Sequence, residues 1–291
     1  DASQSNAPSK NLVSDFDGDG KTDYSVFTPN TGAWQVEASS NGGFSSTAFG
    51  VGEDKIVAGD YDGDGKSDYA VFRPSAGAWY ILGSTRGFFA TAWGTATDVP
   101  VPADYDADGK TDVAVWRPSN GTFYILQSTL GFKAFQWGVN GDKPFAADFE
   151  GDGKPDVGVY RNGAWYIMQS SSSIIYTLPS GAVPVFGTVG DKPLIADFDG
   201  DGRTDISVYR PSNGAWYVTK STDNSLLIYN FGLEEDLPIP ADYDGDGKSD
   251  VAIYRPSVNA WYRLNSSNGA FQAKVFGQTG DKPSPNSVQP Q

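Results

Sequence analysis

The chain has 291 residues, no cysteine, no histidine and a formal net charge of −15. The acidic excess argues against a nucleic-acid partner, because such a partner is bound by clustered cations. The lack of cysteine and histidine excludes disulfides, thiolate metal sites and a nucleophile activated by imidazole. No apolar run reaches the roughly 18 residues that a membrane-spanning helix needs, so we expect no transmembrane segment.

The chain begins with residues 1–10, which are rich in small and polar side chains. We predict a flexible N-terminal lead there, of the kind that cleavage of a signal peptide leaves. This interpretation favours an exported protein, either secreted or held at the cell surface.

An acidic loop of the form D-x-D-x-D-G-x-x-D then recurs six times. The loops are 44 to 49 residues apart and begin at Asp15, Asp60, Asp104, Asp148, Asp197 and Asp242. Each unit contains four short segments rich in Val, Ile, Tyr, Phe and Trp, with Gly, Pro, Asn or Ser at their ends. Such segments are typical of β-strands, and four of them in about 45 residues are typical of a propeller blade.

We therefore predict an all-β fold, a six-bladed β-propeller with four antiparallel strands per blade. The single domain spans residues 11–283, with the acidic loop between the first and second strand of each blade. The predicted blades are residues 11–50, 54–94, 98–138, 142–187, 191–232 and 236–277. Residues 284–291 are predicted to be a flexible C-terminal tail. Between units the chain passes a short turn that we call the corner, and the last unit ends with one, Gly-Asp-Lys-Pro, at residues 280–283. This last corner leads back to the first inner strand, predicted at residues 11–14, and so closes the ring.

Side-chain patterns place the first two strands of each blade. The residue before each loop is always small, as expected beside a narrow central channel: Ser14, Gly59, Ala103, Ala147, Ala196 and Ala241. The second strand is apolar on both faces, as expected of a strand packed between two neighbouring blades. Its paired positions are Val26–Phe27, Val71–Phe72, Val115–Trp116, Val159–Tyr160, Val208–Tyr209 and Ile253–Tyr254.

The loops have the chemistry of calcium sites. Side-chain oxygens come from positions 1, 3, 5 and 9 and a backbone carbonyl from position 7, while glycine at position 6 permits the sharp turn. Calcium is the expected ion because it is satisfied by oxygen ligands alone. We predict about six ions, one per blade. The predicted ligands are Asp15, Asp17, Asp19, Lys21 and Asp23; Asp60, Asp62, Asp64, Lys66 and Asp68; Asp104, Asp106, Asp108, Lys110 and Asp112; Asp148, Glu150, Asp152, Lys154 and Asp156; Asp197, Asp199, Asp201, Arg203 and Asp205; and Asp242, Asp244, Asp246, Lys248 and Asp250.

Two loops depart from the pattern. The fourth has Glu150 at position 3 and Pro155 at position 8, and the third has Ala107 in place of glycine at position 4. The fourth is expected to bind least tightly. An EF-hand is excluded because a strand, rather than a helix with a bidentate Glu, follows each loop. The alternative of acidic turns without an ion would leave four carboxylates repelling one another.

Arginines and tryptophans also recur. Arg73, Arg117, Arg161, Arg210 and Arg255 end the second strands, with Thr28 in the first unit, and Trp34, Trp79, Trp165, Trp216 and Trp261 follow, with Phe123 in the third unit. One interpretation is a repeated anion or sugar site. The other is that each arginine pairs with a corner aspartate and each tryptophan fills the space between blades. The corner aspartates are Asp54, Asp98, Asp142, Asp191, Asp236 and Asp281.

The loop and its following strand, as in DYDGDGKSDYAVF from Asp60 to Phe72, resemble the FG-GAP or VCBS repeat propellers. That group includes the integrin α-subunit head and certain fungal and bacterial lectins, and the resemblance covers about residues 11 to 283. It implies a calcium-binding propeller. It does not specify an activity, because one propeller scaffold hosts many functions.

Three functions follow as hypotheses. The first is an exported, monomeric binding or adhesion module, for glycans or a protein surface outside the cell, in which calcium is structural. The second is a non-catalytic structural propeller of a larger secreted protein. The third is a polysaccharide lyase, since some calcium propellers resembling this one are lyases.

We expect no catalytic residues, because the acids outside loops and corners are few: Asp1, Glu37, Glu53, Asp223, Glu234 and Glu235. Residues 170–184 of the fourth unit form an insertion, a place where a particular function could lie.

Overall fold

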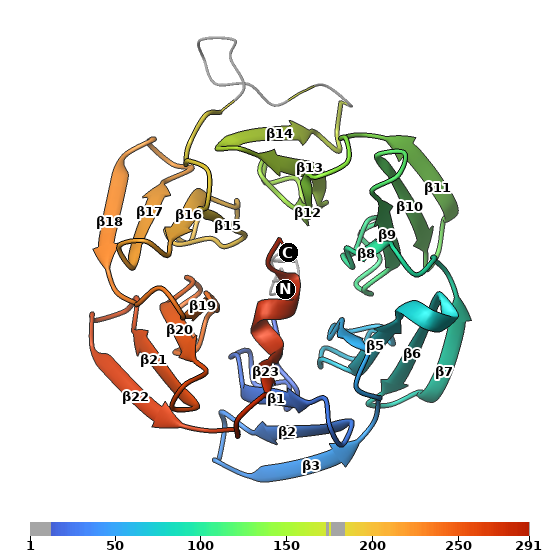
Figure 1. Ribbon diagram of the computed structural model, residues 1–291, viewed down its shortest axis with the longest axis horizontal. Coiled ribbons are helices and arrows are strands. Elements are labelled where there is room, and N and C mark those ends of the chain that lie inside the picture. Colours follow the sequence, from blue (N-terminus) through green and yellow to red (C-terminus); the bar gives the residue numbers. More distant parts are fainter. Residues whose placement is uncertain (1–12, 173–174, 176–183, 291) are drawn as a thin grey trace, which may run out of the picture.

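The computed structural model describes residues 13–172, 175 and 184–290. Six antiparallel sheets are arranged around a central axis, and the predicted all-β, six-bladed propeller is confirmed (Figure 1). The predicted lead at residues 1–10 lies outside the described part of the chain. Among the described residues, no helix is both long and apolar enough to span a membrane.

Five of the six sheets have four named strands. Blade 1 contains β1 (Tyr24–Thr28), β2 (Ala33–Glu37), β3 (Phe44–Ala48) and β23 (Lys282–Pro283); blade 2 contains β4 (Lys55–Ile56), β5 (Tyr69–Arg73), the 3₁₀ helix η1 (Pro74–Ala76), β6 (Ala78–Gly83) and β7 (Gly87–Ala92). Blade 3 contains β8 (Val99–Pro100), β9 (Val113–Arg117), β10 (Thr122–Gln127) and β11 (Gly131–Gln136). Blade 5 contains β15 (Lys192–Leu194), β16 (Ile206–Arg210), β17 (Ala215–Thr219) and β18 (Leu226–Asn230); blade 6 contains β19 (Leu237–Pro238), β20 (Val251–Arg255), β21 (Ala260–Leu264) and β22 (Phe271–Val275).

Blade 4 has three named strands in the described chain: β12 (Lys143–Ala147), β13 (Asp156–Arg161) and β14 (Ala164–Met168). Two isolated bridges, Met168 with Ile175 and Ala164 with Val185, lie where the other blades have their outer strand. Blade 4 is thus the one that departs most from the repeat.

The C-terminus closes the ring. β23 pairs with β1 through Val26 with Pro283 and Phe27 with Lys282, so residues 282–283 supply the inner strand of blade 1. The first inner strand was predicted at residues 11–14, of which residues 11 and 12 lie outside the described part of the chain. Residues 13 and 14 lie in a turn rather than a strand, and the hydroxyl of the buried Ser14 lies 2.8 Å from that of Ser284. The corner aspartate of blade 6 joins the same closure, because Thr28 donates a hydrogen bond to Asp281.

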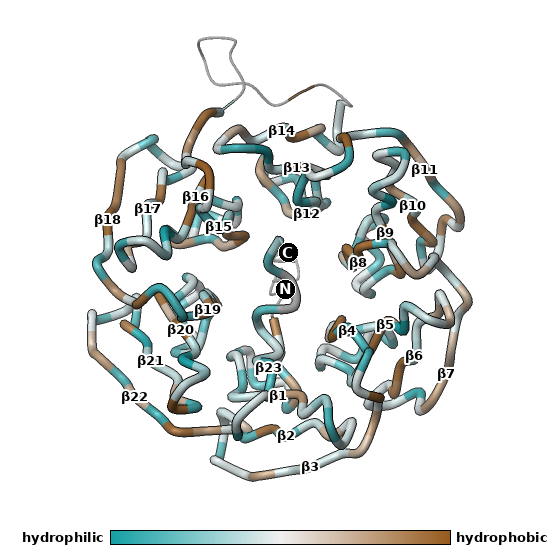
Figure 2. The backbone as a smooth tube through the Cα atoms, in the orientation of Figure 1, coloured by the Kyte–Doolittle hydropathy of each residue, from teal (hydrophilic) through white to brown (hydrophobic). Residues whose placement is uncertain are grey.

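The flexible tail predicted after residue 283 is also not what the structure has. Residues Ser284–Val288 form the 3₁₀ helix η2, which runs from β23 into the middle of the central channel (Figure 1, and Figure 2 in the same orientation). The Asn286 side-chain amide donates to the carbonyl of Pro238, and the Gln289 side chain bonds both the N–H and the carbonyl of Ile195. These polar side chains satisfy the inner edges of blades 5 and 6, which explains why an uncharged polar segment is ordered here.

The packing between blades matches the apolar pattern of the second strand. All six Val or Ile positions and their aromatic neighbours are buried. In five blades the tryptophan of the third strand is buried, and its indole N–H donates to a backbone carbonyl. The acceptor lies just after the outer strand, as when Trp79 donates to Trp93, and in blade 4 it is Phe186. Blade 3 has Phe123 there, but Trp116 from the second strand donates to the equivalent carbonyl of Trp137. In blade 3 the tryptophan is thus on the second strand and the phenylalanine on the third, and the hydrogen bond from the indole to the backbone carbonyl is preserved.

Candidate metal centres in the acidic loops

In blades 2 to 6 the acidic loop connects the inner strand to the second strand, and in blade 1 it leads from the turn at residues 13–14 into β1. In the second loop, the carboxylate of Asp60 at position 1 accepts hydrogen bonds from the backbone N–H groups of Gly63 and Gly65, with N···O distances of 2.6 and 2.8 Å. Both glycines have φ values above +80°, a conformation that is strained for other residues. The first carboxylate therefore shapes the loop around itself.

Five loops bring at least three carboxylates together. Their oxygens lie within 4.8 Å of one another in the sets Asp15, Asp17 and Asp19; Asp60, Asp62 and Asp68; Asp104, Asp106 and Asp108; Asp197, Asp199 and Asp205; and Asp242, Asp244 and Asp246. The fourth loop is absent from these sets, although all its residues are described. Several buried aspartate clusters could thus hold a metal ion.

Buried, unpartnered oxygens support a cation in these clusters. One carboxylate oxygen of the position-3 aspartate, Oδ1 of Asp62, Asp106 and Asp199, is buried and has no hydrogen-bond partner. A carboxylate oxygen without a donor is costly to bury unless a cation lies beside it. The donor set, made only of oxygen, fits calcium.

The position-9 aspartates also accept hydrogen bonds that hold each loop against a neighbouring hairpin. Asp23 accepts the amide of Phe16 within its own loop at 2.7 Å and the amide of Ser39 at 2.6 Å, and the other five do the same in their blades. These aspartates therefore fasten the loop to the hairpin between the third and fourth strands. Burial raises the pKa of Asp68 to about 6 and that of Asp112 to about 7. A nearby divalent cation would favour the ionised form.

The same hairpin holds residues that sequence reasoning missed. Its first two residues are Ser or Thr in every blade: Ser39–Ser40, Ser84–Thr85, Ser128–Thr129, Ser170–Ser171, Ser221–Thr222 and Ser266–Ser267. Their hydroxyls donate to the acids at positions 3 and 5, as Ser39 does to Asp19 and Ser40 to Asp17. In five blades the pair follows the position-9 aspartate by 16 and 17 residues, a fixed offset that could have revealed it.

Neighbouring loops are joined by backbone hydrogen bonds. The position-8 amide of one loop donates to the position-1 carbonyl of the preceding blade, as Thr111 does to Asp60 and Thr22 does to Asp242 across the closure. The corresponding links between loops 1 and 2, 4 and 5, and 5 and 6 are present. Between loops 3 and 4 the donor position is Pro155, which has no N–H. Five of the six blade junctions thus have this link.

The position-7 side chains also reach the preceding loop. A Cβ added to Gly18 would lie 3.1 Å from Cε and Cγ of Lys66, and Gly63 has the same relation to Lys110. The stems of these lysines therefore pack on the neighbouring loop. Metal ligation by their carbonyls remains a prediction.

The inter-loop link can be tested by proline substitution. Thr111→Pro is expected to lower the free energy of unfolding by roughly 0.5–1.5 kcal/mol, because it removes the hydrogen bond to Asp60. Blade 4 already has Pro155 at the equivalent position, so the loop accepts proline. The measurement is urea denaturation in calcium, with Thr111→Ala, which keeps the N–H, as the control. Equal stability of the proline and alanine variants would contradict the role of this amide.

The fourth loop differs from the others in detail. The Glu150 carboxylate accepts the amide and hydroxyl of Ser171 at 2.9 Å each, and the Ser170 hydroxyl lies near both Glu150 and Asp152. The longer glutamate side chain is thus engaged by the hairpin. This agrees with the expectation that loop 4 is the weakest ion site, which stays a prediction.

The corner motif proves to be structural. Each second-strand arginine pairs with its corner aspartate through Nε and Nη2, and the aspartates are buried; the pairs are Arg73–Asp54, Arg117–Asp98, Arg161–Asp142, Arg210–Asp191 and Arg255–Asp236. Each guanidinium also lies over a third-strand tyrosine, as Arg73 does over Tyr80. The arginines are occupied within the repeat, so the interpretation as pairing residues is confirmed.

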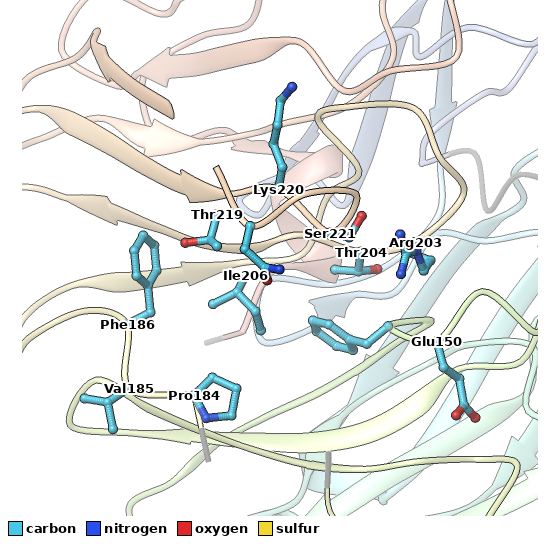
Figure 3. A pocket seen from close by; sticks show the side chains of 12 residues that line it. Glu150, Pro184, Val185, Phe186, Arg203, Thr204, Ile206, Thr219, Lys220 and Ser221 are labelled. Carbon is cyan, nitrogen blue, oxygen red and sulfur yellow. The ribbon is translucent and has the colours of Figure 1, made fainter. Parts of the chain in front are cut away.

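A cavity of about 300 Å³ opens between blades 4 and 5. Figure 3 shows Pro184, Val185 and Phe186 on one side of it and Ile206 and Thr219 on the other. Thr219 occupies the position that has a leucine in blades 2, 3 and 6, so this junction has more room. The cavity lies where the fourth unit departs from the repeat.

Comparison with known proteins agrees with this architecture. The family model described as an FG-GAP-like repeat matches residues 15–71, 60–115 and 104–159. No curated protein matches the chain significantly.

Solved structures show the same fold at low identity. An Agrocybe aegerita lectin, described as recognising non-reducing terminal N-acetylglucosamine, aligns with a TM-score of 0.54 and 18% identity over 90% of this chain and 78% of its own. Staphylococcus aureus virginiamycin B lyase aligns with a TM-score of 0.51 and 9% identity over 94% and 95% of the two chains. Kluyveromyces lactis Hsv2 aligns with a TM-score of 0.50 and 12% identity over 88% and 74%. With three successive FG-GAP-like repeats in a six-bladed ring, the chain belongs to the FG-GAP repeat β-propellers.

Proposed function

We propose that this protein is an exported, calcium-stabilised propeller that binds neutral glycans at its outer edge. Calcium is supported by the carboxylate clusters and by the unpartnered oxygens of Asp62, Asp106 and Asp199. Loops of this kind are useful where calcium is millimolar, as it is outside cells. The binding function is supported by the outer strands.

The observation that favours glycans is a ring of exposed apolar side chains at one equivalent position of all six blades. We call it the apolar rim: Phe44, Phe88, Phe132, Ile175, Leu226 and Phe271, which are between 42% and 64% exposed. Each pairs with the fifth residue of its third strand, as Phe88 does with Leu82. The outer strands that hold most of them form the circumference of the ring (Figure 1).

The rim aromatics lie at the junctions between blades. Phe88 packs edge-on against Phe49 of the preceding blade with ring centroids 6.2 Å apart, and Phe132 packs against Trp93 at 5.6 Å. Phe44 contacts Phe276, and Phe271 contacts Phe231, in the same way. At four junctions an exposed rim phenylalanine therefore packs against a second aromatic ring, next to a polar hairpin. The second ring is half-buried in three of them and buried in the case of Phe276.

This arrangement suits sugars better than a protein partner. A sugar ring offers an apolar face to an aromatic ring, while its hydroxyls bond to neighbouring polar groups. A stable protein interface needs about 800 Å² on each side. The rim instead offers small patches separated by blades, which suits the repeated residues of a polysaccharide and allows multivalent binding.

A glycan array in calcium tests the proposal. Wild-type protein is expected to bind neutral glycans, and the double variant Phe88→Ala with Phe132→Ala is expected to reduce the apparent affinity at least about tenfold. Leu130→Ala is the control, because Leu130 is 70% exposed on the same hairpin as Phe132 but is not part of the rim. An array on which folded wild-type protein binds nothing would overturn the proposal and favour a purely structural propeller.

The structure adds nothing in favour of the lyase hypothesis. Among the acids outside loops and corners, Glu37 forms an ion pair with Lys274. Glu53 accepts a hydrogen bond from the Ser75 hydroxyl, and Glu235 accepts one from the Ser257 hydroxyl. Each of the three has its own partner.

A further inference from the structure

One position of the third strand carries a charge in blade 6 and is apolar in every other blade. Arg263 of β21 occupies the position where the other five blades have a buried valine or isoleucine: Val36, Ile81, Ile125, Ile167 and Val218. An aliphatic side chain is enough for packing between blades at this position, so the repeat itself does not require an arginine. The junction between blades 6 and 1, which are neighbours in the ring, therefore has a chemistry of its own (Figure 1).

Two aromatic rings hold the Arg263 guanidinium in place. Its Cζ atom lies 5.4 Å from the ring centroid of Tyr243 in loop 6 and 5.8 Å from that of Tyr24 in blade 1. Contacts between a guanidinium and aromatic rings are favourable, and they restrict a side chain that is otherwise flexible. Arg263 is thus positioned in advance, which lowers the entropy cost of binding a ligand.

The guanidinium of Arg263 has no acceptor in the protein. Within the described chain it forms no ion pair and no hydrogen bond, and its Nε is buried without a partner. The terminal nitrogens Nη1 and Nη2 are not buried in this way, so they reach solvent at the partly exposed surface of the side chain. Folded proteins rarely leave such donors unpaired, and an unpaired group is commonly explained by a missing ion or ligand.

The corner arginines show which group Arg263 lacks. Arg73 lies over the ring of Tyr80 and also pairs with the carboxylate of Asp54 through Nε and Nη2. The other four corner arginines have the same two contacts. Arg263 has the aromatic contacts but no carboxylate, so a carboxylate from outside the chain would complete the same arrangement.

The other charged groups at this junction are already engaged. Lys274 forms an ion pair with Glu37 across the junction, and its ammonium lies 4.9 Å from the ring centroid of Tyr24. Asp250, the position-9 acid of loop 6, accepts two backbone N–H groups in its own blade. The side chains of Lys274 and Glu37 are 30% and 25% exposed, so solvent reaches this part of the junction. Beside this ion pair, the charge of Arg263 is balanced by one singly charged anion.

We propose that the junction between blades 6 and 1 binds the carboxylate of an acidic sugar residue, a uronate, through the terminal nitrogens of Arg263. The planar guanidinium matches a carboxylate with two parallel hydrogen bonds. A sugar is favoured as the carrier because Phe44 of the apolar rim lies directly opposite Glu37 and packs against Phe276, so the charged junction continues into the rim. The proposal rests on glycan binding at the rim and adds that one of the six junctions selects an acidic residue.

NMR titration with methyl glucuronide and methyl glucoside, in calcium and at constant ionic strength, tests the proposal. The wild type is expected to bind the glucuronide at least about tenfold more tightly, because hydrogen bonds between charged groups are stronger than neutral ones. Arg263→Ile should reduce this ratio to about one, and it should fold because blades 2, 3 and 4 have isoleucine at this position. Arg263→Lys keeps the charge but not the planar fork, so it should retain only part of the preference.

The control is Arg86→Gln, which removes the same charge elsewhere. Arg86 lies over the ring of Phe89 and forms no ion pair in the described chain, so the variant should keep the wild-type ratio. Melting curves report folding of all variants. Acetate, which has no sugar ring, should displace the glucuronide only at a much higher concentration; equal competition would overturn the choice of a sugar.

The outcomes separate this proposal from glycan binding itself. If the wild type binds both sugars equally, or if Arg263→Ile keeps the preference, the acidic site is overturned while glycan binding at the rim stands. Binding of the glucuronide alone, lost in Arg263→Ile, would support the acidic site and count against neutral glycans. If folded wild-type protein binds neither sugar, both proposals are overturned.

Discussion

Excess EDTA is expected to lower the melting temperature of this propeller by more than about ten degrees, because each ion at ~100 times its dissociation constant stabilises the native state by roughly 2.7 kcal/mol. Five loops bring three carboxylates within 4.8 Å. Removing the ions would leave these charges to repel one another at one end of every inner strand. The measurement is a calorimetric or circular dichroism melt, with and without chelator.

Two controls accompany the chelation experiment: adding ions back, and substituting residues inside and outside the loops. Restoring calcium should return the original curve, whereas magnesium, which demands a tighter octahedral site, should restore less. Asp62→Asn, which alters an unpartnered oxygen in loop 2, should reduce the effect of EDTA, whereas Asp223→Asn, outside the loops, should not. Identical melting curves in calcium and in EDTA would contradict a structural role for the ions.

Truncation after Gly280 is expected to destabilise the ring by roughly 3–5 kcal/mol, since several hydrogen bonds of about 1 kcal/mol each are lost together with buried groups. It removes β23, which supplies the inner strand of blade 1, and the bond from Thr28 to Asp281. It also removes η2 from the channel. The inner edge of β1, at Val26 and Phe27, would then be unpaired.

Chemical denaturation in calcium measures this loss. Truncation after Gln289 is the matched control, because it keeps both β23 and the Gln289 bonds to Ile195. The shorter protein should also be cleaved faster by protease near blade 1, since local opening exposes its backbone. If both truncations unfold at the same denaturant concentration as the full chain, the C-terminal segment does not close the ring.

The repeat could be predicted from the sequence because each blade repeats the same local rules. The apolar pairs such as Val71–Phe72, the glycines at loop position 6 and the arginine with its corner aspartate recur at fixed offsets, so each copy supports the others. The blade interfaces and the Arg–Asp pairs follow from that pattern.

What the sequence did not predict depends on contacts across the ring. The pairing of Pro283 with Val26 joins residues 257 positions apart, and no local pattern specifies it. The order of residues 284–290 depends on acceptors offered by Pro238 and Ile195. The exchange of Trp116 and Phe123 is visible in the sequence, but only the shared carbonyl of Trp137 shows that it preserves a hydrogen bond.

Counting bound ions by native mass spectrometry tests the calcium sites most directly. Protein equilibrated in millimolar calcium and then exchanged into volatile buffer should retain five or six calcium ions, with the last one, assigned to the loop of Glu150 and Pro155, lost most readily. Folded protein that retains no calcium under these conditions would contradict the account of the acidic loops.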